Sequence, residues 1–157
     1  MDLDDFDRKI LQLLQKDSKI SAKEISEITD HPITTVYARI KKLEDARIIK
    51  NYGAVLDASK VGKPTTAFIL TSITYRAPGV DETLDQRKIA KEVAHFPEVQ
   101  EVHIITGDWD LLIKVKAENV AAIGNFVVDK LRTVKGIEKT LTCMVFDTIK
   151  ETLEIQL

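Results

Sequence analysis

The sequence contains a single cysteine, Cys143, and few aromatic residues, which account for 6% of its 157 residues. A lone cysteine cannot form a disulfide within the chain, which fits a reducing compartment, and we expect it to be a small buried residue. No apolar run approaches the roughly 20 residues that cross a bilayer. The opening residues, MDLDDFDRK, also lack the basic start and apolar stretch of a secretory signal. The sequence therefore predicts a cytoplasmic protein.

Motifs for catalysis are missing as well. His31, His95 and His103 fall in a turn, at a helix end and in a strand of the expected structure, without metal-ligand spacing. There is no glycine-rich phosphate loop and no nucleophile elbow. Asp108 and Asp110 resemble a carboxylate pair, but no nucleophile or base accompanies them. We therefore expect no enzymatic activity and no cofactor or metal ion.

A generally basic surface is missing too, because the formal net charge is -2. This argues against nonspecific coating of nucleic acid. Positive charge is instead concentrated in residues 32–50, PITTVYARIKKLEDARIIK, where five Lys and Arg residues against two carboxylates give a net charge of +3. Apolar and charged residues make up 44% and 31% of the chain, which indicates a soluble globular protein with one basic segment.

The same segment carries a helical pattern. Ile33, Val36, Ile40 and Leu43 recur at steps of three and four residues, which places them on one buried stripe of an α-helix. The opposite side has small groups and then cations, with no carboxylate before Glu44. Such a side can approach a polyanion. A solvated amphipathic surface helix is the commoner explanation for an isolated basic helix, so the interpretation depends on the neighbouring segments.

Two further helices are predicted before this segment. The first begins at its N-cap and covers residues 4–16. The second begins at a capping box formed by Ser21 and Glu24 and ends near Thr29. A turn of three or four residues then leads to Pro32, which suits the first position of the third helix. Three short helices with this tight turn predict a helix-turn-helix, whose third helix enters the DNA major groove.

The expected DNA contacts divide by chemistry. Hydroxyl, methyl and guanidinium groups can read base edges, whereas lysines contact phosphates and position the protein without reading sequence. Tyr37 either caps the core or faces the groove. The predicted base-edge residues are Thr34, Thr35, Ala38 and Arg39, with Arg39 bidentate to guanine, and the predicted phosphate contacts are Lys23, Lys41 and Lys42.

The rest of the chain alternates strand and helix patterns. A strand-like run at residues 48–56 is followed by DASKVGKP, which we take as the domain boundary. The order βαββαβ that follows is typical of a ferredoxin-like domain. One antiparallel sheet backed by two helices leaves its other face uncovered, so we expect association through that face. The predicted strands cover residues 65–76, 99–106, 111–117 and 137–149, the helices residues 86–96 and 120–131, and a loop residues 77–85.

Together these segments resemble the Lrp/AsnC regulators, the feast/famine transcription factors. The resemblance covers essentially the whole chain and rests on LDDFDRKIL, KDSKISAKEISEI and TTVYARIKKLEDARIIKNYGAVLDASKVG. It implies an α+β protein with an N-terminal helix-turn-helix (winged-helix-like) domain and a C-terminal ferredoxin-like βαββαβ domain. The implied division is a DNA-binding domain at 1–50, a linking strand and hinge at 51–64, and an effector-binding and oligomerisation domain of the regulation of amino-acid metabolism type at 65–157. In relatives the linking strand pairs with that of a second subunit, and the resemblance implies the same here.

Two positions depart from the family pattern. Pro32 stands where the family usually has a serine, so we expect Asp30 or His31 to cap the third helix. Arg47 stands where the family usually has a glycine, and we expect it to take a backbone conformation that glycine adopts more easily.

The turn TGDWD, at residues 106–110, matches the family's Gly-Asp-x-Asp turn. Glycine lets the backbone approach a ligand, free N–H groups can bind a carboxylate, and aspartates can bind an ammonium group. An ordinary hairpin explains the same residues, and both interpretations stay open. Relatives complete this pocket with residues from a neighbouring dimer, and the resemblance implies residues 136–140 for that part. The effector-binding candidates are Thr106, Gly107, Asp108, Trp109, Asp110, Gly136 and Thr140.

The leading hypothesis is a sequence-specific DNA-binding transcriptional regulator whose assembly or DNA binding is modulated by an amino acid or related small metabolite. Its partners would be double-stranded DNA, this effector and further copies of the chain, as a homodimer that assembles into tetramers or octamers, and it would be nucleoid-associated. Two alternatives are an architectural oligomer that compacts DNA with little sequence preference, and a metabolite sensor whose first domain contacts protein.

Overall fold

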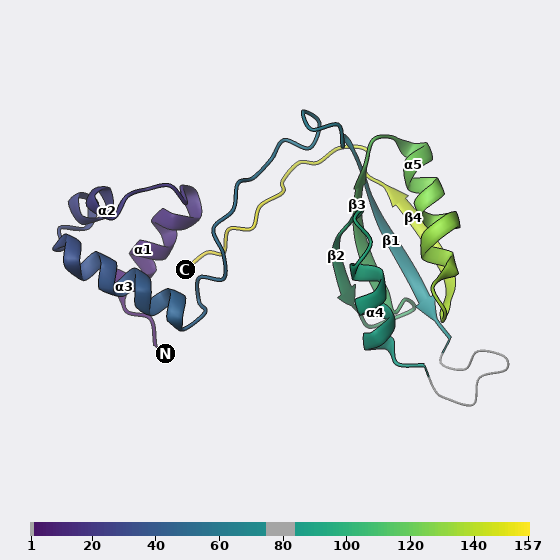
Figure 1. The fold of residues 1–157 in the computed structure, drawn as a ribbon, viewed down its shortest axis with the longest axis horizontal. Helices are drawn as coiled ribbons and strands as arrows, with labels where there is room; N and C mark the ends of the chain where they lie inside the picture. Colours follow the sequence, from purple (N-terminus) through teal and green to yellow (C-terminus); the bar gives the residue numbers. More distant parts are fainter. Residues whose placement is uncertain (1, 75–83) are drawn as a thin grey trace. The chain divides into compact units, whose positions relative to one another are not determined.

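The computed structural model describes residues 2–74 and 84–157. Figure 1 shows two compact units, one made of Met1–Val55 with Lys150–Leu157 and the other of Leu56–Ile149. We call them the helical unit and the sheet unit. No helix in the described parts of the chain is long and apolar enough to cross a membrane.

The helical unit contains the three expected helices. They are α1 (Asp5–Lys16), α2 (Ala22–Thr29) and α3 (Ile33–Asp45). Their buried side chains form one core, because the apolar positions recur at helical spacing on each of them. The fully or almost fully buried members of this core are Ile10, Leu11, Ala22, Ile25, Val36 and Leu43. The predicted helix-turn-helix is therefore confirmed.

Capping boxes begin the first two helices. The Asp4 side chain accepts the N–H of Asp7 at 2.7 Å, and the Asp7 carboxylate accepts the N–H of Asp4 at 3.3 Å. The predicted box at Ser21 and Glu24 is also present. Helix α2 ends at Asp30, whose left-handed backbone, with φ 54°, turns the chain toward α3.

Helix α3 ends in a Schellman motif. The N–H of Arg47 donates to the carbonyl of Glu44 at 2.8 Å, and the N–H of Ile48 donates to that of Leu43 at 3.0 Å. This motif requires a left-handed residue at the position of Arg47, whose φ is 55°. The expected glycine-like conformation of Arg47 is confirmed.

The strand predicted at residues 48–56 does not form within the single chain. No strand is present among residues 2–64, and Tyr52, Val55 and Leu56 are exposed. The reason is that a strand needs a hydrogen-bonded neighbour, and nothing in the described chain pairs with this segment. We call residues 46–64, between α3 and the sheet, the linker.

The sheet unit has the predicted βαββαβ order. Its sheet is antiparallel throughout, with strand order β2-β3-β1-β4. Helix α5 continues as a π-helical turn over Phe126–Lys130 and a 3-10 turn over Leu131–Thr133. The elements are β1 (Thr65–Ile73), α4 (Gln86–Ala94), β2 (Val99–Ile104), β3 (Leu111–Ala117), α5 (Val120–Asn125) and β4 (Ile137–Met144).

Several elements end earlier than predicted. The last strand stops at Met144 instead of residue 149, because the N–H of Val145 donates to Thr66 at the start of β1 and no neighbouring strand extends further. Strand β1 ends at Ile73, and its predicted last residues, 75 and 76, lie outside the described residues, as does most of the loop at 77–85. Strand β2 ends at Ile104 and α4 at Ala94, each two residues early.

Helices cover one side of the sheet and leave the other side open. Alternate residues of β1 and β3 are buried and pack with the side chains of α4 and α5. By the strand register, Phe68, Leu70 and Leu141 lie on the opposite side, where Leu141 is 45% exposed. Cys143 pairs with Phe68 on that side and is exposed, so the prediction of a buried cysteine is wrong. This uncovered side of the sheet agrees with the expectation drawn from a sheet with two helices.

The last eight residues depart from the expected division of the chain. The sequence predicts one domain over residues 65–157, whereas Lys150–Leu157 belong to the helical unit. Side chains of α1 explain this, because Gln12 and Gln15 hydrogen-bond to the backbone of this segment.

Candidate DNA-binding surface and effector turn

Helix α3 presents one acid-free stripe to solvent. Thr34, Ala38, Lys41 and Lys42 are all exposed. Ala38 follows Thr34 by four residues, and Lys41 and Lys42 follow Ala38 by three and four, so they lie on one side of the helix. Val36 and Leu43, both 0% exposed, hold the opposite side in the core. We call these four exposed residues the α3 stripe. Its hydroxyl, methyl and ammonium groups suit base edges and phosphates.

The stripe begins at a helix end that no side chain caps. Pro32 is the N-cap residue of α3 and has no side-chain acceptor. The expected cap from Asp30 or His31 is wrong, because the His31 ring stacks on Phe6 with a centroid distance of 3.8 Å and its Nδ1 lies 2.6 Å from the carbonyl of Thr29. The first turn of α3 therefore offers uncapped N–H groups, the arrangement that binds phosphate at helix starts.

Arg39 does not belong to the stripe. Its guanidinium lies 2.8 Å from Asp4 Oδ2 and donates to both carboxylate oxygens of Asp7, at 3.1 and 3.2 Å. It also lies 5.8 Å from the centroid of the Phe6 ring. All of these contacts with Asp4 and Asp7 are made by Nη1, and they hold the guanidinium toward the start of α1. In the structure Arg39 instead ties α3 to the start of α1.

The buried carboxylate of Asp7 depends on its contact with Arg39. Its side chain is 1% exposed, and a buried carboxylate is stable only when it is paired and hydrogen-bonded. The N–H of Asp7 and then the nearby Arg39 lower the pKa of the exposed Asp4 below its usual value of 3.8. The sequence contains a signal for this cluster, because Asp7 precedes Ile10 by three positions and so lies on the buried stripe of α1.

The other predicted DNA contacts differ in exposure. Thr35 is half-buried beside the stripe. Lys23, on α2, has a side chain 78% exposed and lies 3.9 Å from Glu27 one turn later, a weak surface pair that leaves the ammonium group free to exchange partners. Lys41 and Lys42 have no ion pair among the described residues. Tyr37, whose role the sequence left open, is 61% exposed and so does not cap the core.

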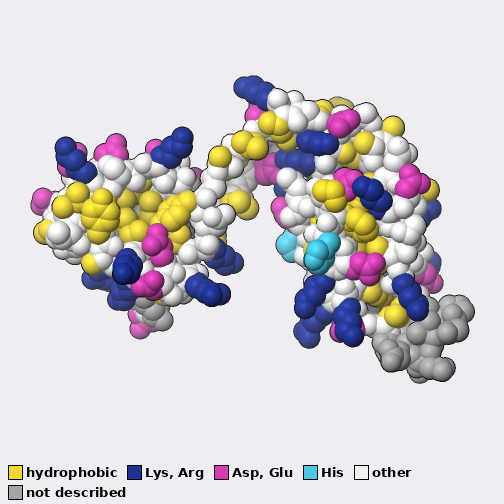
Figure 2. All heavy atoms as spheres, in the orientation of Figure 1, with side chains coloured by type: hydrophobic (Ala, Val, Ile, Leu, Met, Phe, Trp, Pro, Cys, Tyr) yellow, Lys and Arg dark blue, Asp and Glu magenta, His cyan; other side chains and the backbone are white. Residues whose placement is uncertain are grey.

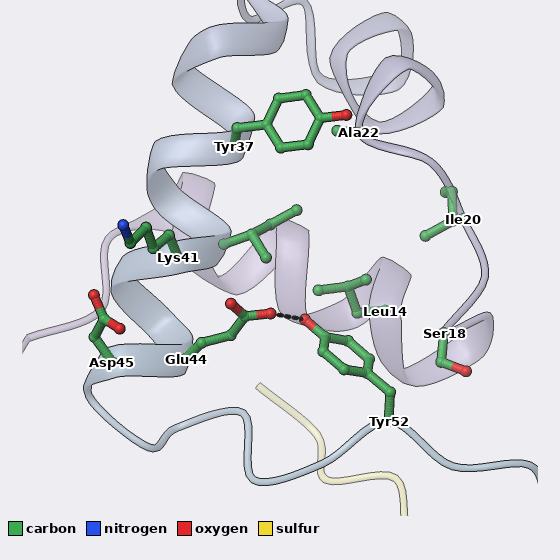
Figure 3. A pocket seen from close by; sticks show the side chains of 10 residues that line it. Leu14, Ser18, Ile20, Ala22, Tyr37, Lys41, Glu44, Asp45 and Tyr52 are labelled. Carbon is green, nitrogen blue, oxygen red and sulfur yellow. Dashed lines mark hydrogen bonds between the residues drawn. The ribbon is translucent and has the colours of Figure 1, made fainter.

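Beside α3 the helical unit has a hollow of about 560 Å³. Figure 3 shows Tyr52 of the linker reaching across it to Glu44 of α3, with an O–H to Oε1 hydrogen bond of 2.9 Å. Burial, and then this hydrogen bond, raises the pKa of Tyr52 to about 12, so the phenol stays a donor at neutral pH. The contact holds the start of the linker on α3. Leu14, Ile20, Tyr37 and Ile40 supply most of the apolar lining.

The predicted effector turn is open to solvent at its tip. Thr106, Gly107 and Asp108 are exposed, and Trp109 is half-buried. Gly107 has φ 120°, a conformation that favours glycine, and no atom lies within 4 Å of a Cβ built there. A small ligand can therefore reach the backbone of this turn.

Asp110 has a structural contact that the sequence does not indicate. Its Oδ2 accepts the N–H of Ile73 at 2.7 Å, and its own N–H donates to the carbonyl of Thr71 at 2.8 Å. Gln86, at the start of α4, lies 3.4 Å from Oδ1. These bonds fasten the turn to the end of β1, so the Asp110 carboxylate is already engaged.

The second group of candidates meets the first at this strand end. The Gly136 carbonyl accepts the N–H of Thr74 at 2.9 Å, and Thr140 pairs with Thr71. The Thr140 hydroxyl accepts from Arg132 Nε at 3.1 Å. Gly136 is buried with φ 101°, a backbone conformation that favours glycine, and a Cβ there would lie 2.6 Å from Ile89 Cδ1, so that side chain would have to shift. Both groups converge within one chain because β1 lies between β3 and β4.

Two hydroxyl groups near this strand end lack partners. Thr71 Oγ1 and Ser72 Oγ are buried and have no hydrogen-bond partner among the described residues. Buried hydroxyls usually find a partner in the protein, in ordered water or in a ligand. No group of three or more His, Cys, Asp or Glu side chains in the described residues could hold a metal ion.

Two family descriptions match the chain. A winged helix-turn-helix DNA-binding family matches residues 3–50, and the Lrp/AsnC ligand binding domain matches residues 79–155. The first covers α1 to α3, and the second covers the turn at Gly107 and the region of Gly136 and Thr140.

Proteins named as transcriptional regulators match over nearly the full chain. An HTH-type transcriptional regulator of Pyrococcus abyssi is 42% identical over 149 residues, which cover 95% of this chain and 96% of that protein. The HTH-type transcriptional regulator FL11 of Pyrococcus furiosus is 36% identical over 153 residues, which cover 98% and 95%. The solved structure of a transcriptional regulator of Neisseria meningitidis in complex with L-Met superimposes with a TM-score of 0.89 and 32% identity, covering 98% of this chain and 96% of that one.

Proposed function

Because the chain belongs to the Lrp/AsnC family of helix-turn-helix transcriptional regulators, we propose that it binds specific DNA sequences under the control of a small metabolite. Members of this family are not enzymes. The observation that supports sequence-specific binding is the α3 stripe, an exposed line of small polar, methyl and ammonium groups without a carboxylate. Two of the lysines that make residues 32–50 basic, Lys41 and Lys42, therefore lie on the exposed side of α3.

In the proposed complex α3 lies in the major groove. Thr34 and Ala38 meet base edges, with Thr35 at their margin, while Lys23, Lys41 and Lys42 meet phosphates. The uncapped first turn of α3 adds backbone N–H groups for a phosphate. Arg39 keeps α3 in place through Asp4 and Asp7 instead of reading a base.

We propose a homodimer that assembles further into tetramers or octamers. The side of the sheet away from the helices supports association, because Phe68, Leu70 and Leu141 lie together on it. A two-fold dimer presents two copies of α3 to half-sites that are about 10 bp or a multiple of it apart, so the binding site would be roughly palindromic. Such a regulator would work in the cytoplasm, in association with the nucleoid.

We also propose that the regulatory ligand is an amino acid or a related metabolite, bound where the Gly107 turn and the Gly136 to Thr140 region meet the end of β1. Open N–H groups at Gly107 suit a carboxylate, Asp108 suits an ammonium group, and the unpaired hydroxyls of Thr71 and Ser72 are nearby in the strand. The regulator of Neisseria meningitidis was solved with L-Met, which makes methionine the first amino acid to test.

The experiment is a selection of genomic fragments at physiological salt, repeated with each amino acid. We expect enrichment of a palindromic motif, with a set of fragments that changes for one amino acid. Equal affinity for selected and random fragments, together with a steep salt dependence, would instead support an architectural protein.

Isothermal titration then tests the control by the metabolite. Coupling between two sites is reciprocal, so a ligand that changes DNA affinity must itself bind with a different affinity when DNA is present. Identical affinities with and without the selected DNA would exclude the regulatory part of the proposal. Lack of binding by any amino acid or related metabolite would exclude the effector site.

A further inference from the structure

Helix α4 of the sheet unit carries a second exposed line of positive charge. Arg87 and Lys91 are one turn apart and Lys88 lies beside them, so the three cations share one side of the helix. All three are exposed, whereas Ile89 and Val93 hold the opposite side in the core. Figure 2 shows Lys and Arg side chains gathered over α4. We call Arg87, Lys88 and Lys91 the α4 stripe.

Few carboxylates offset the α4 stripe. Within α4 the three cations stand against one acidic residue, Glu92, which gives the helix a net charge of +2. Asp85 precedes the helix, but its carboxylate caps the first turn by accepting the N–H of Arg87 at 2.8 Å. The side chains of the α4 stripe form no ion pair among residues 2–74 and 84–157.

Other cations of the sheet unit are paired with acidic groups. The ammonium group of Lys63 donates to Glu118 at 3.3 Å, and that of Lys114 donates to Glu101 at 3.1 Å. Each pair places a negative charge beside the positive one and so weakens the attraction for an outside anion. The α4 stripe keeps its full positive charge toward solvent.

The exposed side of α4 has the chemistry of a surface that binds a polyanion. Protein interfaces have an apolar core in which lysine is rare, whereas interfaces with DNA are polar and strongly positive. The exposed residues of α4 are charged, apart from Ala94. Arg87 and Lys91 are about 6 Å apart along the helix axis, and a duplex carries about one phosphate charge per 1.7 Å, so both cations can meet phosphates of one duplex.

We propose that the α4 stripe is a second DNA contact, made to the phosphate backbone outside the half-sites that α3 reads. The contact does not depend on base sequence, because lysine and arginine on phosphates neutralise charge without reading a base. It rests on the proposed function only in taking DNA as the partner. It gives the matched ligand binding domain, residues 79–155, a direct part in holding DNA. Long DNA is then bound more tightly, and with a steeper salt dependence, than the half-sites alone.

Binding titrations of the full chain at several salt concentrations test this contact. The double variant Arg87→Gln with Lys91→Gln removes two cations, and glutamine is a good helix former. One DNA fragment is trimmed to the selected half-sites, and a second keeps long flanking DNA on both sides. On the long fragment we expect an affinity at least about tenfold lower, and a slope of log affinity against log salt that is smaller by about 2. The trimmed fragment should bind the variant as tightly as the parent.

Lys60→Gln with Lys63→Gln is the matched control. It removes the same charge from the sheet unit, but at lysines that lie beside the carboxylates of Asp57 and Glu118. Affinity for the long fragment and its salt slope should change little. Circular dichroism of both double variants should match that of the parent, because all four positions are exposed.

Two results would overturn the inference. One is a long-fragment affinity and salt slope of the α4 variant that equal those of the parent or of the control. The other is a smaller assembly in sedimentation without DNA, which would make the α4 stripe a contact between copies of the chain. The outcomes also separate the two proposals. Dependence on the α4 stripe without preference for a selected sequence contradicts only the regulator, and such a preference without this dependence contradicts only the α4 contact.

Discussion

Arg39 shows how a single contact changes the role of a residue. Its sequence position places a guanidinium beside the DNA, but in the structure that group bonds to Asp4 and Asp7. Asp7 is 1% exposed, and its charge needs this partner. Residue-scale features that depend on backbone geometry were more predictable, as the left-handed Arg47 illustrates. The partner of a long flexible side chain was not, because it depends on how α1 and α3 pack.

Substitution of Arg39 by alanine should lower the free energy of unfolding by about 2 kcal/mol, because the buried Asp7 carboxylate loses its charged hydrogen-bond donor. Urea denaturation followed by circular dichroism measures this. Arg8→Ala, which removes an exposed arginine from α1, is the control and should change stability little. If Arg39→Ala keeps full stability and loses DNA affinity, Arg39 is a base reader after all.

Substitution of Arg47 by glycine should raise the free energy of unfolding by about 1 kcal/mol, because an L-residue with positive φ is strained and glycine is not. The same denaturation experiment applies. Arg47→Ala removes the charge and keeps the strain, so it should give no such gain. Equal stabilisation by both variants would attribute the effect to charge instead of backbone.

At the scale of elements, the sequence correctly predicted those helices and strands that are determined by local sequence signals. The box at Ser21 and Glu24 marked the start of α2, and alternation marked β3. The elements that differed depend on distant partners. Strand β4 stops where β1 begins, and the linker forms no strand because no segment of the described chain pairs with it. No local pattern contains that information.

The capping box of α2 predicts a pH dependence. Hydrogen bonds from the Ser21 hydroxyl and then its N–H lower the pKa of Glu24 below its ordinary 4.5. The unfolded chain therefore takes up this proton first as the pH falls. The contribution of Glu24 to the free energy of unfolding is complete above the pKa of the unfolded state. It is lost as the pH falls through the lower pKa of the folded state.

Glu24→Gln removes this titration and keeps an acceptor. The melting temperature of the parent should exceed that of the variant at about pH 6.5, and the gap should close toward about pH 3. Glu27→Gln, on the same helix but outside the box, is the charge-matched control. A gap for Glu24→Gln that stays constant with pH would contradict the account.

Helix α3 predicts a difference between its two kinds of contact. Lys42→Ala should weaken binding to all DNA sequences and reduce the slope of log affinity against log salt by about 1, because one phosphate contact is lost. Thr34→Ala should keep the slope and alter preference at one base position. Binding titrations at several salt concentrations, on selected and random DNA, measure both. The assignments are reversed or wrong if Thr34→Ala changes the salt slope and Lys42→Ala does not.

For the whole molecule, the sequence predicted a helical part and a βαββαβ part because each has its own periodicity. It did not predict that the chain returns to the helical unit after β4, since the contacts are made by two glutamines of α1 that look like ordinary surface residues. It also did not predict that Asp110, Gly136 and Thr140 meet at one strand end, which follows from the position of β1 between β3 and β4. Figure 2 shows hydrophobic side chains left on the visible surface of both units, which is consistent with a protein built to associate.

The most direct measurement concerns the α3 stripe, on which the regulator account depends. Ala38→Glu puts a carboxylate at the centre of the stripe, and because this position is exposed and glutamate is a good helix former, the fold should be unaffected. Ala121→Glu, at an exposed position of α5, is the matched control. The account predicts a loss of affinity for the selected DNA of roughly 30-fold or more, equivalent to about 2 kcal/mol, for Ala38→Glu and almost none for Ala121→Glu. Unchanged affinity of a folded Ala38→Glu protein would contradict it.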